Sequence, residues 1–232
     1  MGYVPVFLEV SGRSCIIIGG GNVAESKARA LLEAGAIVTV VDAQASAGIK
    51  LETGGGDVRY LARGYEYGDL RGNSLAYVAT GDPEVARRAA REARELGIPL
   101  NVVDRPEFST FISPATFKRG DLQIAISTGG SSPAVARMLR ERLEQQIGPE
   151  YASLLEILSR ARQFLRDSET NQDGRACILK SLARTLLDSV ETLDNTLIDE
   201  ALRQHLHVGM AELGLDAQHH IKPCGPAGAS TR

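Results

Sequence analysis

Between residues 15 and 104, short apolar runs alternate with stretches in which apolar residues recur at helical spacing. The apolar runs predict buried strands, and the stretches between them predict helices that each end at a glycine. We expect strands at residues 15–18, 37–41, 57–62, 75–80 and 100–104, and helices at residues 24–34 and 84–96. Strands and helices that alternate in this way build a parallel sheet with helices on both faces.

The pattern changes after residue 105. Residues 106–114 are irregular, residues 122–127 alternate as in a strand, and residues 134–146 have helical periodicity. The rest of the chain predicts helices at residues 151–166, 174–187 and 194–213. One face of the first of these helices is apolar enough to pack against a neighbour. It carries Leu154, Leu155, Leu158, Ala161 and Leu165.

The first predicted strand runs into three glycines, Gly19, Gly20 and Gly21, and then into a helix. With Ala24 the spacing is G-x-G-x-x-A, the dinucleotide-binding fingerprint of a strand–turn–helix unit. The N–H groups of Gly21, Asn22 and Val23 would lie at the helix start, where a phosphate is attracted. A glycine turn without a ligand is the alternative.

Polar residues end the other predicted strands of this sheet. Asp42 follows the second strand, where a carboxylate would accept hydrogen bonds from ribose hydroxyls; the alternative is that Asp42 caps a turn. Thr80 and Asp104 end two later strands. Because ligands of parallel sheets bind at the carboxyl ends of the strands, we expect Gly19, Asp42, Thr80 and Asp104 to line one crevice.

A second glycine loop follows the strand predicted at residues 122–127. It consists of Thr128, Gly129, Gly130, Ser131 and Ser132, with Pro133 near the first helical position. Its N–H groups and hydroxyls would suit an anion at a helix N-terminus. A helix start capped by its own side chains explains these residues equally well.

Composition narrows the possible functions. The net charge of −3 gives no sign of nucleic acid or of an acidic membrane as a partner, and no apolar run reaches the length of a membrane span. Residues 1–10 lack the basic region of a signal peptide.

The three cysteines are far apart and fit neither a disulfide framework nor a metal site, so we expect a reducing, cytoplasmic location. The four histidines suggest no metal ligands, because His205 and His207 would lie on different helix faces and His219 and His220 fall in the tail.

Several of these stretches together resemble one family, in order and in spacing. They are Pro5-Val6-Phe7-Leu8, Gly19 to Ala24, Lys27-Ala28-Arg29, Asn101 to Asp104, Phe111 to Pro114 and Ser127 to Ala134. The chain resembles the precorrin-2 dehydrogenase/sirohydrochlorin ferrochelatase family, the amino-terminal module of siroheme synthase. The resemblance covers residues 1–143. The chain is too short for the methyltransferase module that is fused to this one in some relatives.

The resemblance implies an organisation. A Rossmann NAD-binding domain would span residues 1–113, a central dimerisation and substrate-binding segment residues 114–147, and a helical domain residues 148–215. Residues 216–232, rich in Gly, Pro and Ala, are expected to form a disordered tail. The protein would be a homodimer.

The resemblance also implies an activity and its residues. The expected reaction is NAD-dependent oxidation of precorrin-2 to sirohydrochlorin, followed in many relatives by insertion of Fe²⁺, a substrate, to give siroheme. Asp104 matches the catalytic aspartate, and Asn22, Val23, Ala43 and Gln44 match positions that contact NAD. Because the tetrapyrrole carries many carboxylates, the loop from Thr128 to Ser132 is expected to bind it. Thr128 departs from the Ser of some relatives by one methyl group.

Two other functions compete with this hypothesis. A Rossmann dimer could sense NAD and regulate a partner without chemistry, but such a sensor needs neither Asp104 nor the loop at residues 127–133. An NAD oxidoreductase for an unrelated small substrate would need a His, Lys or Tyr beside the cofactor, and the sequence offers no convincing one.

Overall fold

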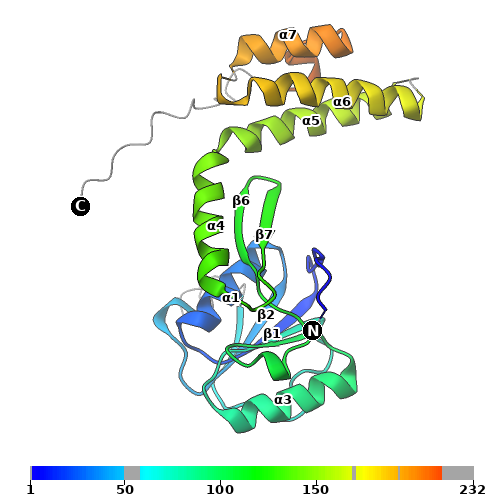
Figure 1. Ribbon diagram of the computed structural model, residues 1–232. Coiled ribbons are helices and arrows are strands. Elements are labelled where there is room, and N and C mark those ends of the chain that lie inside the picture. The colour runs from blue at the N-terminus through cyan, green and yellow to red at the C-terminus, as the bar shows by residue number, and fades with distance from the viewer. Residues whose placement is uncertain (1, 50–57, 169–170, 193, 216–232) are drawn as a thin grey trace. The chain divides into compact units, whose positions relative to one another are not determined.

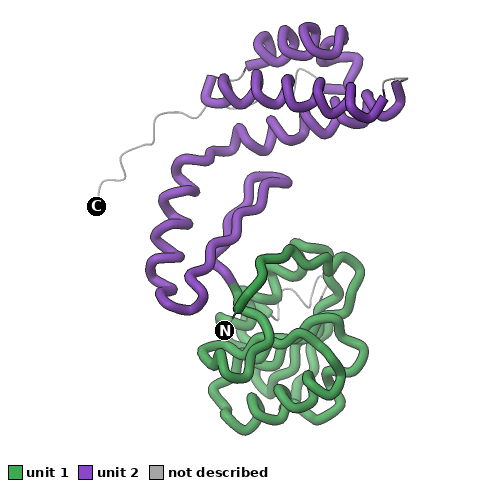
Figure 2. Tube along the Cα trace, turned by 45° about the vertical axis from the view of Figure 1, so that its right-hand side comes forward, with its two compact units in different colours: residues 1–113 green, residues 114–232 purple. Residues whose placement is uncertain are grey.

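The computed structural model spans residues 1–232 and describes residues 2–49, 58–168, 171–192 and 194–215. The predictions for Asp57, Cys224, His219, His220 and the tail lie outside these ranges. The chain divides into two compact units, residues 1–113 and 114–232, which are coloured separately in Figure 2.

Unit 1 contains a five-stranded parallel sheet (Figure 1). Its strands are β1 (Ser14–Ile18), β2 (Ile37–Val41), β3 (Val58–Leu61), β4 (Leu75–Val78) and β5 (Leu100–Val102). The order β3-β2-β1-β4-β5 places β1 at the centre, where the side chains from Cys15 to Ile18 are at most 2% exposed. The α/β prediction of a Rossmann-type parallel sheet is confirmed, and the strand order reverses between β1 and β4, where such sheets bind ligands.

Two helices cover opposite faces of this sheet. Alanines of α1 (Asn22–Glu33) pack with Cys15 and Ile17 of β1, whereas alanines of α3 (Pro83–Leu96) pack with Ile16 and Ile18. The division follows from the strand geometry, since successive side chains of β1 point to opposite faces. Small residues on both helices allow a close approach to the sheet. Helix α3 starts one residue before the predicted start and ends where predicted, with Asp82 as N-cap and Gly97 in the left-handed conformation as C-cap.

The segment from Tyr65 to Leu70 forms irregular hydrogen-bonded turns rather than a regular helix. The carboxylate of Glu92, only 1% exposed, accepts hydrogen bonds from the N–H groups of Gly68 and Leu70 at 3.0 and 3.1 Å and from the Tyr65 hydroxyl. A side chain from α3 thus satisfies the backbone that a helix would have satisfied internally.

Unit 2 begins with a β-hairpin that the sequence pattern only half predicted. Strand β6 (Ala115–Arg119) pairs antiparallel with β7 (Leu122–Ile126) through a turn at Gly120 and Asp121, where Gly120 has φ +56°. Only β7 was expected. Strand β6 has the sequence ATFKR, which carries too little alternation to identify it.

In the described part of unit 2, four α-helices follow the hairpin: α4 (Pro133–Gln146), α5 (Glu150–Arg166), α6 (Gln172–Asp188) and α7 (Asn195–Leu206). The helix predicted at residues 194–213 was too long. It ends at Leu206 because His207 adopts a left-handed conformation with φ +59°, and only a short 3₁₀ turn follows at Ala211–Leu213. Helix α6 starts two residues earlier than predicted, since the Asn171 side chain caps it by accepting from the Gly174 N–H at 2.8 Å.

The helices of unit 2 build their own apolar core. The predicted face of α5 is buried at Leu154, Ala161 and Leu165, joined by Ile157, whereas Leu155 and Leu158 are only partly buried. The core continues on α6 and α7 with Leu182, Leu186, Ile198 and Leu202. Among the described residues, no helix combines the length and the apolar character that crossing a bilayer requires.

Candidate functional site

The turn between β1 and α1 depends on two glycines. Gly19 has φ +123° and donates its N–H to the Val41 carbonyl at 2.9 Å, and a Cβ atom there would overlap the carbonyl oxygen of Ala79. At Gly20 a Cβ atom would lie 2.9 Å from the Asp42 Cβ and from the Ala45 Cα. No side chain fits at either position without moving the backbone directly after β4 or the loop after β2.

Gly21 is different, because nothing lies near it. It is the N-cap of α1 in an extended conformation, with φ −84° and ψ −174°, and no side chain caps the helix. A Cβ atom at Gly21 would meet no atom within 4 Å, and Asn22 and Val23 beside it are exposed. The first N–H groups of α1 thus have no capping side chain, and the space beside Gly21 is open, which is the arrangement that binds a phosphate.

The loop after β2 is held beside this turn by Tyr60 and Ser46. The Tyr60 hydroxyl donates to the Asp42 carbonyl at 2.8 Å and accepts from the Ala45 N–H at 3.1 Å. The Ser46 N–H donates to the Gly20 carbonyl at 2.7 Å, and the Ser46 hydroxyl donates to Glu25 at 2.8 Å. Sequence reasoning missed these residues, since their role depends on contacts between separate strands.

Within that loop, Asp42 caps a turn. Its Oδ1 accepts a hydrogen bond from the Gln44 N–H at 2.7 Å, and the side chains of Ala43 and Gln44 are exposed. The turn-capping alternative for Asp42 therefore holds for one carboxylate oxygen. It does not conflict with ribose binding, because a carboxylate has a second oxygen with its own acceptor sites.

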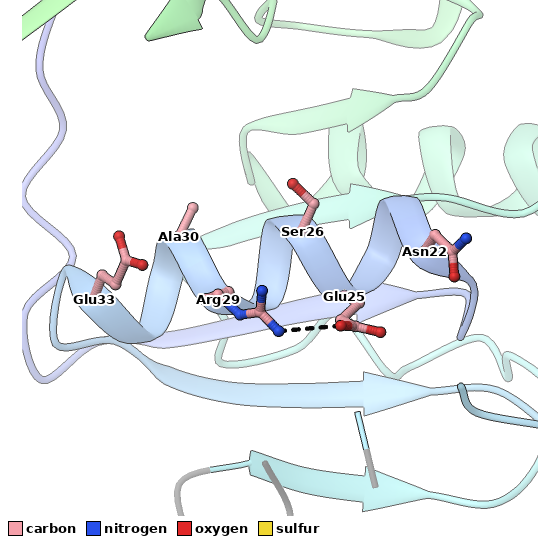
Figure 3. A pocket seen from close by; sticks show the side chains of 6 residues that line it. All are labelled: Asn22, Glu25, Ser26, Arg29, Ala30 and Glu33. Carbon is pink, nitrogen blue, oxygen red and sulfur yellow. Dashed lines mark hydrogen bonds and ion pairs between the residues drawn. The ribbon is translucent and has the colours of Figure 1, made fainter. Parts of the chain in front are cut away.

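A hollow lies along the outer face of α1, lined by Asn22, Glu25, Ser26, Arg29, Ala30 and Glu33 (Figure 3). Arg29 and Glu25 form an ion pair across it at 3.1 Å. Of the predicted site residues only Asn22 belongs to it. Charged side chains at helical spacing are typical of a solvated helix face, so we place the site at the glycine turn.

Asp104 follows β5 in a tight turn. It has φ +59°, a left-handed conformation that is uncommon for a residue with a side chain, and its side chain is exposed. The turn is closed by a hydrogen bond from the Arg105 N–H to the Val102 carbonyl at 3.2 Å. Strand β5 ends two residues earlier than predicted because Val103 and Asp104 form this turn.

Thr80 takes part in the turn between β4 and α3. Its hydroxyl accepts a hydrogen bond from the Asp82 N–H at 3.3 Å. Since β5, β4, β1 and β2 are neighbours in the sheet, unit 1 brings the ends of these strands, and with them Asp104, Thr80, Gly19 and Asp42, to one edge. Neighbouring strands are about 4.8 Å apart, so this edge can be spanned by a dinucleotide and a substrate together.

A lysine and two aromatic rings lie on the α1 face of the sheet. The Lys27 ammonium is 5.5 Å from the centre of the Tyr77 ring, and Tyr77 meets Phe111 edge-on, with ring centres 5.5 Å apart. Burial lowers the pKa of Lys27 and raises the pKa of Tyr77. Lys27 and Phe111 stand in the stretches that carry the family resemblance, but nothing in the sequence indicated that they would share a cluster.

The second glycine loop, in unit 2, is closed by its own hydrogen bonds. The Thr128 hydroxyl donates to the Ser132 carbonyl and accepts from the Ser132 N–H, both at 3.0 Å. Ser132 caps α4 by accepting from the Val135 N–H at 3.3 Å, and Ser127 accepts from the Gly129 N–H at 3.0 Å. These contacts correspond to the capped helix start that was the alternative for this loop. Gly130 and Ser131 are exposed at its tip.

Comparisons with known proteins agree with this architecture. Residues 6–115 match the family model described as putative NAD(P)-binding, and residues 119–146 match the model of the sirohaem biosynthesis protein central region. A siroheme synthase of Azotobacter vinelandii is 43% identical over 164 residues, 70% of this chain and 35% of that protein. The chain belongs to the siroheme synthase family. A second member, the siroheme synthase of Pseudomonas aeruginosa, is 34% identical over 216 residues, 92% of this chain and 46% of that protein.

A solved structure extends the family comparison. The protein titled SirC, precorrin-2 dehydrogenase, matches with a TM-score of 0.67 and 25% identity over 82% of this chain and 100% of that chain. These matches confirm the predicted family and the predicted NAD(P)-binding fold of unit 1. The chain spans between about a third and a half of the length of the siroheme synthases described above.

The predicted site residues are divided between the two units. Unit 1 gathers the predicted cofactor residues and Asp104 at one sheet edge, whereas the predicted substrate residues, from Thr128 to Ser132, belong to unit 2. Among the described residues, no group of three or more His, Cys, Asp or Glu side chains could hold a metal ion.

Proposed function

We propose that this protein catalyses the NAD-dependent oxidation of precorrin-2 to sirohydrochlorin. The observation that carries the proposal is the pairing of an uncapped helix start at Gly21 with the carboxylate of Asp104 at the same edge of one parallel sheet. The names of the related proteins, siroheme synthase and precorrin-2 dehydrogenase, supply the substrate class.

The residues around Gly21 fit a dinucleotide. The open space at Gly21 admits a pyrophosphate to the N–H groups of Asn22 and Val23, and Gly19 and Gly20 keep the turn free of side chains. Asp42 would accept hydrogen bonds from the ribose hydroxyls, with Ala43, Gln44 and Thr80 lining the rest of the site. NAD⁺, when bound, supplies the hydride acceptor of the reaction. Asp42 would repel a 2′-phosphate, so we expect NAD to be preferred over NADP, and equal kcat/KM for the two would contradict this role.

Asp104 would act as the general base. Oxidation of precorrin-2 removes one hydride and one proton, and the carboxylate of Asp104 accepts the proton while the hydride leaves. Asp104 is exposed and can contact a ligand directly, and the end of a buried strand holds its backbone in place. The same carboxylate can accept pyrrole N–H protons when Fe²⁺, as a substrate, enters sirohydrochlorin to give siroheme.

The loop from Thr128 to Ser132 would bind carboxylates of the tetrapyrrole. The Thr128 and Ser132 hydroxyls already hold the loop together. Gly130 and Ser131, exposed at its tip, are therefore the residues we expect to contact the substrate. Replacement of Gly130 by a bulky residue should weaken tetrapyrrole binding and leave NAD affinity unchanged.

We also propose that the protein is a cytoplasmic homodimer that forms through residues 114–147, with residues 148–215 as a helical domain. Within residues 114–147 the aromatic ring of Phe117 is buried and is not available to a partner. Helix α4, however, exposes three apolar side chains at helical spacing: Val135 (46%), Met138 (64%) and Leu139 (40%). Such a stripe favours a partner surface. A monomer by light scattering at micromolar concentration would contradict this proposal.

The decisive experiment compares the wild type with Asp104→Asn in an anaerobic assay with precorrin-2 and NAD, followed by addition of Fe²⁺. Asn keeps the shape and tolerates the left-handed conformation, but it removes the basic oxygen. We expect turnover to fall about 10²–10⁴-fold, with unchanged NAD affinity. Wild-type turnover in this variant would remove Asp104 from the mechanism. A wild type that binds NAD but oxidises nothing would favour the NAD sensor instead.

A further inference from the structure

Strand β5 is the outermost strand on one side of the sheet. Two hydroxyl side chains accept hydrogen bonds from the backbone N–H groups on its unpaired side, which we call the lateral edge. The Leu100 N–H donates to the Thr110 hydroxyl at 2.8 Å, and the Val102 N–H donates to the Ser109 hydroxyl at 2.9 Å. The Thr110 N–H donates in return to the Leu100 carbonyl at 2.8 Å. Residues 109–110 thus take the place of a sixth strand, and they leave no N–H group of this edge unpaired.

Ser109 makes one contact that Thr110 lacks. The Thr110 hydroxyl bonds only to Leu100, with a further oxygen contact of 3.3 Å to the Leu100 carbonyl. The Ser109 hydroxyl lies 3.2 Å from the Val102 carbonyl and 3.2 Å from the Arg105 carbonyl. These two carbonyls stand on either side of Asp104, so one hydroxyl spans the turn that carries the carboxylate.

The turn at Asp104 needs such a constraint. With φ +59°, Asp104 occupies a region where a side chain is unfavourable, and outside the strand one backbone hydrogen bond closes the turn, from Arg105 to Val102 at 3.2 Å. A residue in a sparsely populated conformation persists when its surroundings hold it there. Without the hydroxyl, the Arg105 carbonyl would lose one of its two bonds and the Asp104 side chain could reorient.

We propose that Ser109 is a positioning residue for Asp104: its hydroxyl fixes the turn from Val102 to Arg105 and so holds the carboxylate in the direction that accepts the substrate proton. The inference rests on the proposed function of Asp104. Thr110 provides the matched control, because its hydroxyl closes the same strand edge but does not reach the Asp104 turn.

The test compares Ser109→Ala, Ser109→Thr and Thr110→Val in the full-length protein. Both Ser109→Ala and Thr110→Val remove one edge hydroxyl, and we expect similar falls in thermal stability. Ser109→Ala should lower kcat for precorrin-2 oxidation about 10–100-fold with unchanged KM and NAD affinity, since misplacement of a reacting group costs rate rather than binding. Thr110→Val should keep kcat within about two-fold of the wild type, and Ser109→Thr should restore most of the activity.

A double-mutant cycle with Asp104→Asn separates the two proposals. If Ser109 acts through Asp104, Ser109→Ala should cause little further loss of turnover in the Asp104→Asn background. A loss that adds in full, or equal losses of kcat in Ser109→Ala and Thr110→Val, would overturn the positioning role and leave the role of Asp104 intact. Normal turnover in Asp104→Asn itself would remove Asp104, and with it Ser109, from the mechanism, whereas a wild type that oxidises no precorrin-2 would refute the proposed function.

Discussion

The two glycine loops of this protein occupy similar places in the fold, but they differ in whether a side chain caps the helix that follows. Each joins a strand to the N-terminus of a helix, one between β1 and α1 and the other between β7 and α4. At α1 the N-cap is Gly21, which offers no side chain to the helix. At α4 the N-cap is Ser132, whose hydroxyl accepts from the Val135 N–H at 3.3 Å, and Thr128 closes the loop behind it. The first helix start is open, and the second is already satisfied by its own side chains.

This difference separates a site that needs a ligand from one that does not. The uncapped N–H groups of α1 have positive partial charge and no side-chain partner, so a phosphate can bind there without displacing anything. At α4 an anion must compete with Ser132 or use the loop tip instead. We therefore expect dinucleotide binding to depend strongly on the first loop, and substrate binding to depend on the second loop through Gly130 and Ser131.

The largest effect is expected from Gly19→Ala. The new Cβ atom would overlap the Ala79 carbonyl oxygen, at a φ of +123° that side chains avoid. We expect a loss of about 3 kcal/mol or more in the free energy of unfolding, measured by chemical denaturation. Gly129→Ala is the control, since its φ of +63° is also positive but no atom lies near its Cβ position, and it should cost only about 1 kcal/mol. Equal losses would mean that the clash with the Ala79 carbonyl is unimportant.

A smaller effect of mixed sign is expected from Gly21→Asp. Asp is a better N-cap than Gly, and open space surrounds this position, so the unliganded protein should gain a few tenths of a kcal/mol in stability. The same carboxylate occupies the place of the phosphate, and NAD affinity should fall on the order of 100-fold. Isothermal titration with NAD, alongside denaturation of the free protein, checks both signs. Unchanged NAD affinity would exclude this helix start as the phosphate site.

The sequence predicted where both loops lie, but it could not predict which of them is open. The fingerprint from Gly19 to Ala24 depends on local spacing, so it identified the first helix start correctly. The contact that requires glycine at position 19 comes from Ala79, which directly follows β4 and is 60 residues away, and no local pattern contains it. In the second loop the outcome depends on the direction of the Thr128 hydroxyl, which is settled only once the loop conformation exists. The same limitation concealed the role of Ser109 at the edge of β5, since an edge is a property of the whole sheet.

The third prediction concerns the closure of the second loop. Thr128→Val removes the hydroxyl that bonds to both the N–H and the carbonyl of Ser132, and we expect a loss of about 1–2 kcal/mol in local stability. Thr128→Ser keeps the hydroxyl without the methyl group and should behave as the wild type. Hydrogen exchange of the backbone amides at residues 129–132 is the appropriate measurement. If Thr128→Val exchanges no faster than Thr128→Ser, the hydroxyl does not hold the loop.

The smallest effect is expected from Ser132→Gly, which makes the second helix start resemble the first. Gly replaces Ser at an N-cap at a cost of only a few tenths of a kcal/mol, whereas Ser132→Ala should cost about 1 kcal/mol. Since the Ser132 hydroxyl is occupied by the Val135 N–H, its removal should not weaken tetrapyrrole binding. The exposed N–H of Val135 could even add an anion contact. Tetrapyrrole affinity, measured by fluorescence quenching on both variants and on the wild type, shows whether the Ser132 hydroxyl only caps the helix or also contacts the substrate. A marked loss of affinity in both would mean that this hydroxyl leaves the helix to bind the substrate, and the contrast between an open and a closed loop would then hold only for the free protein.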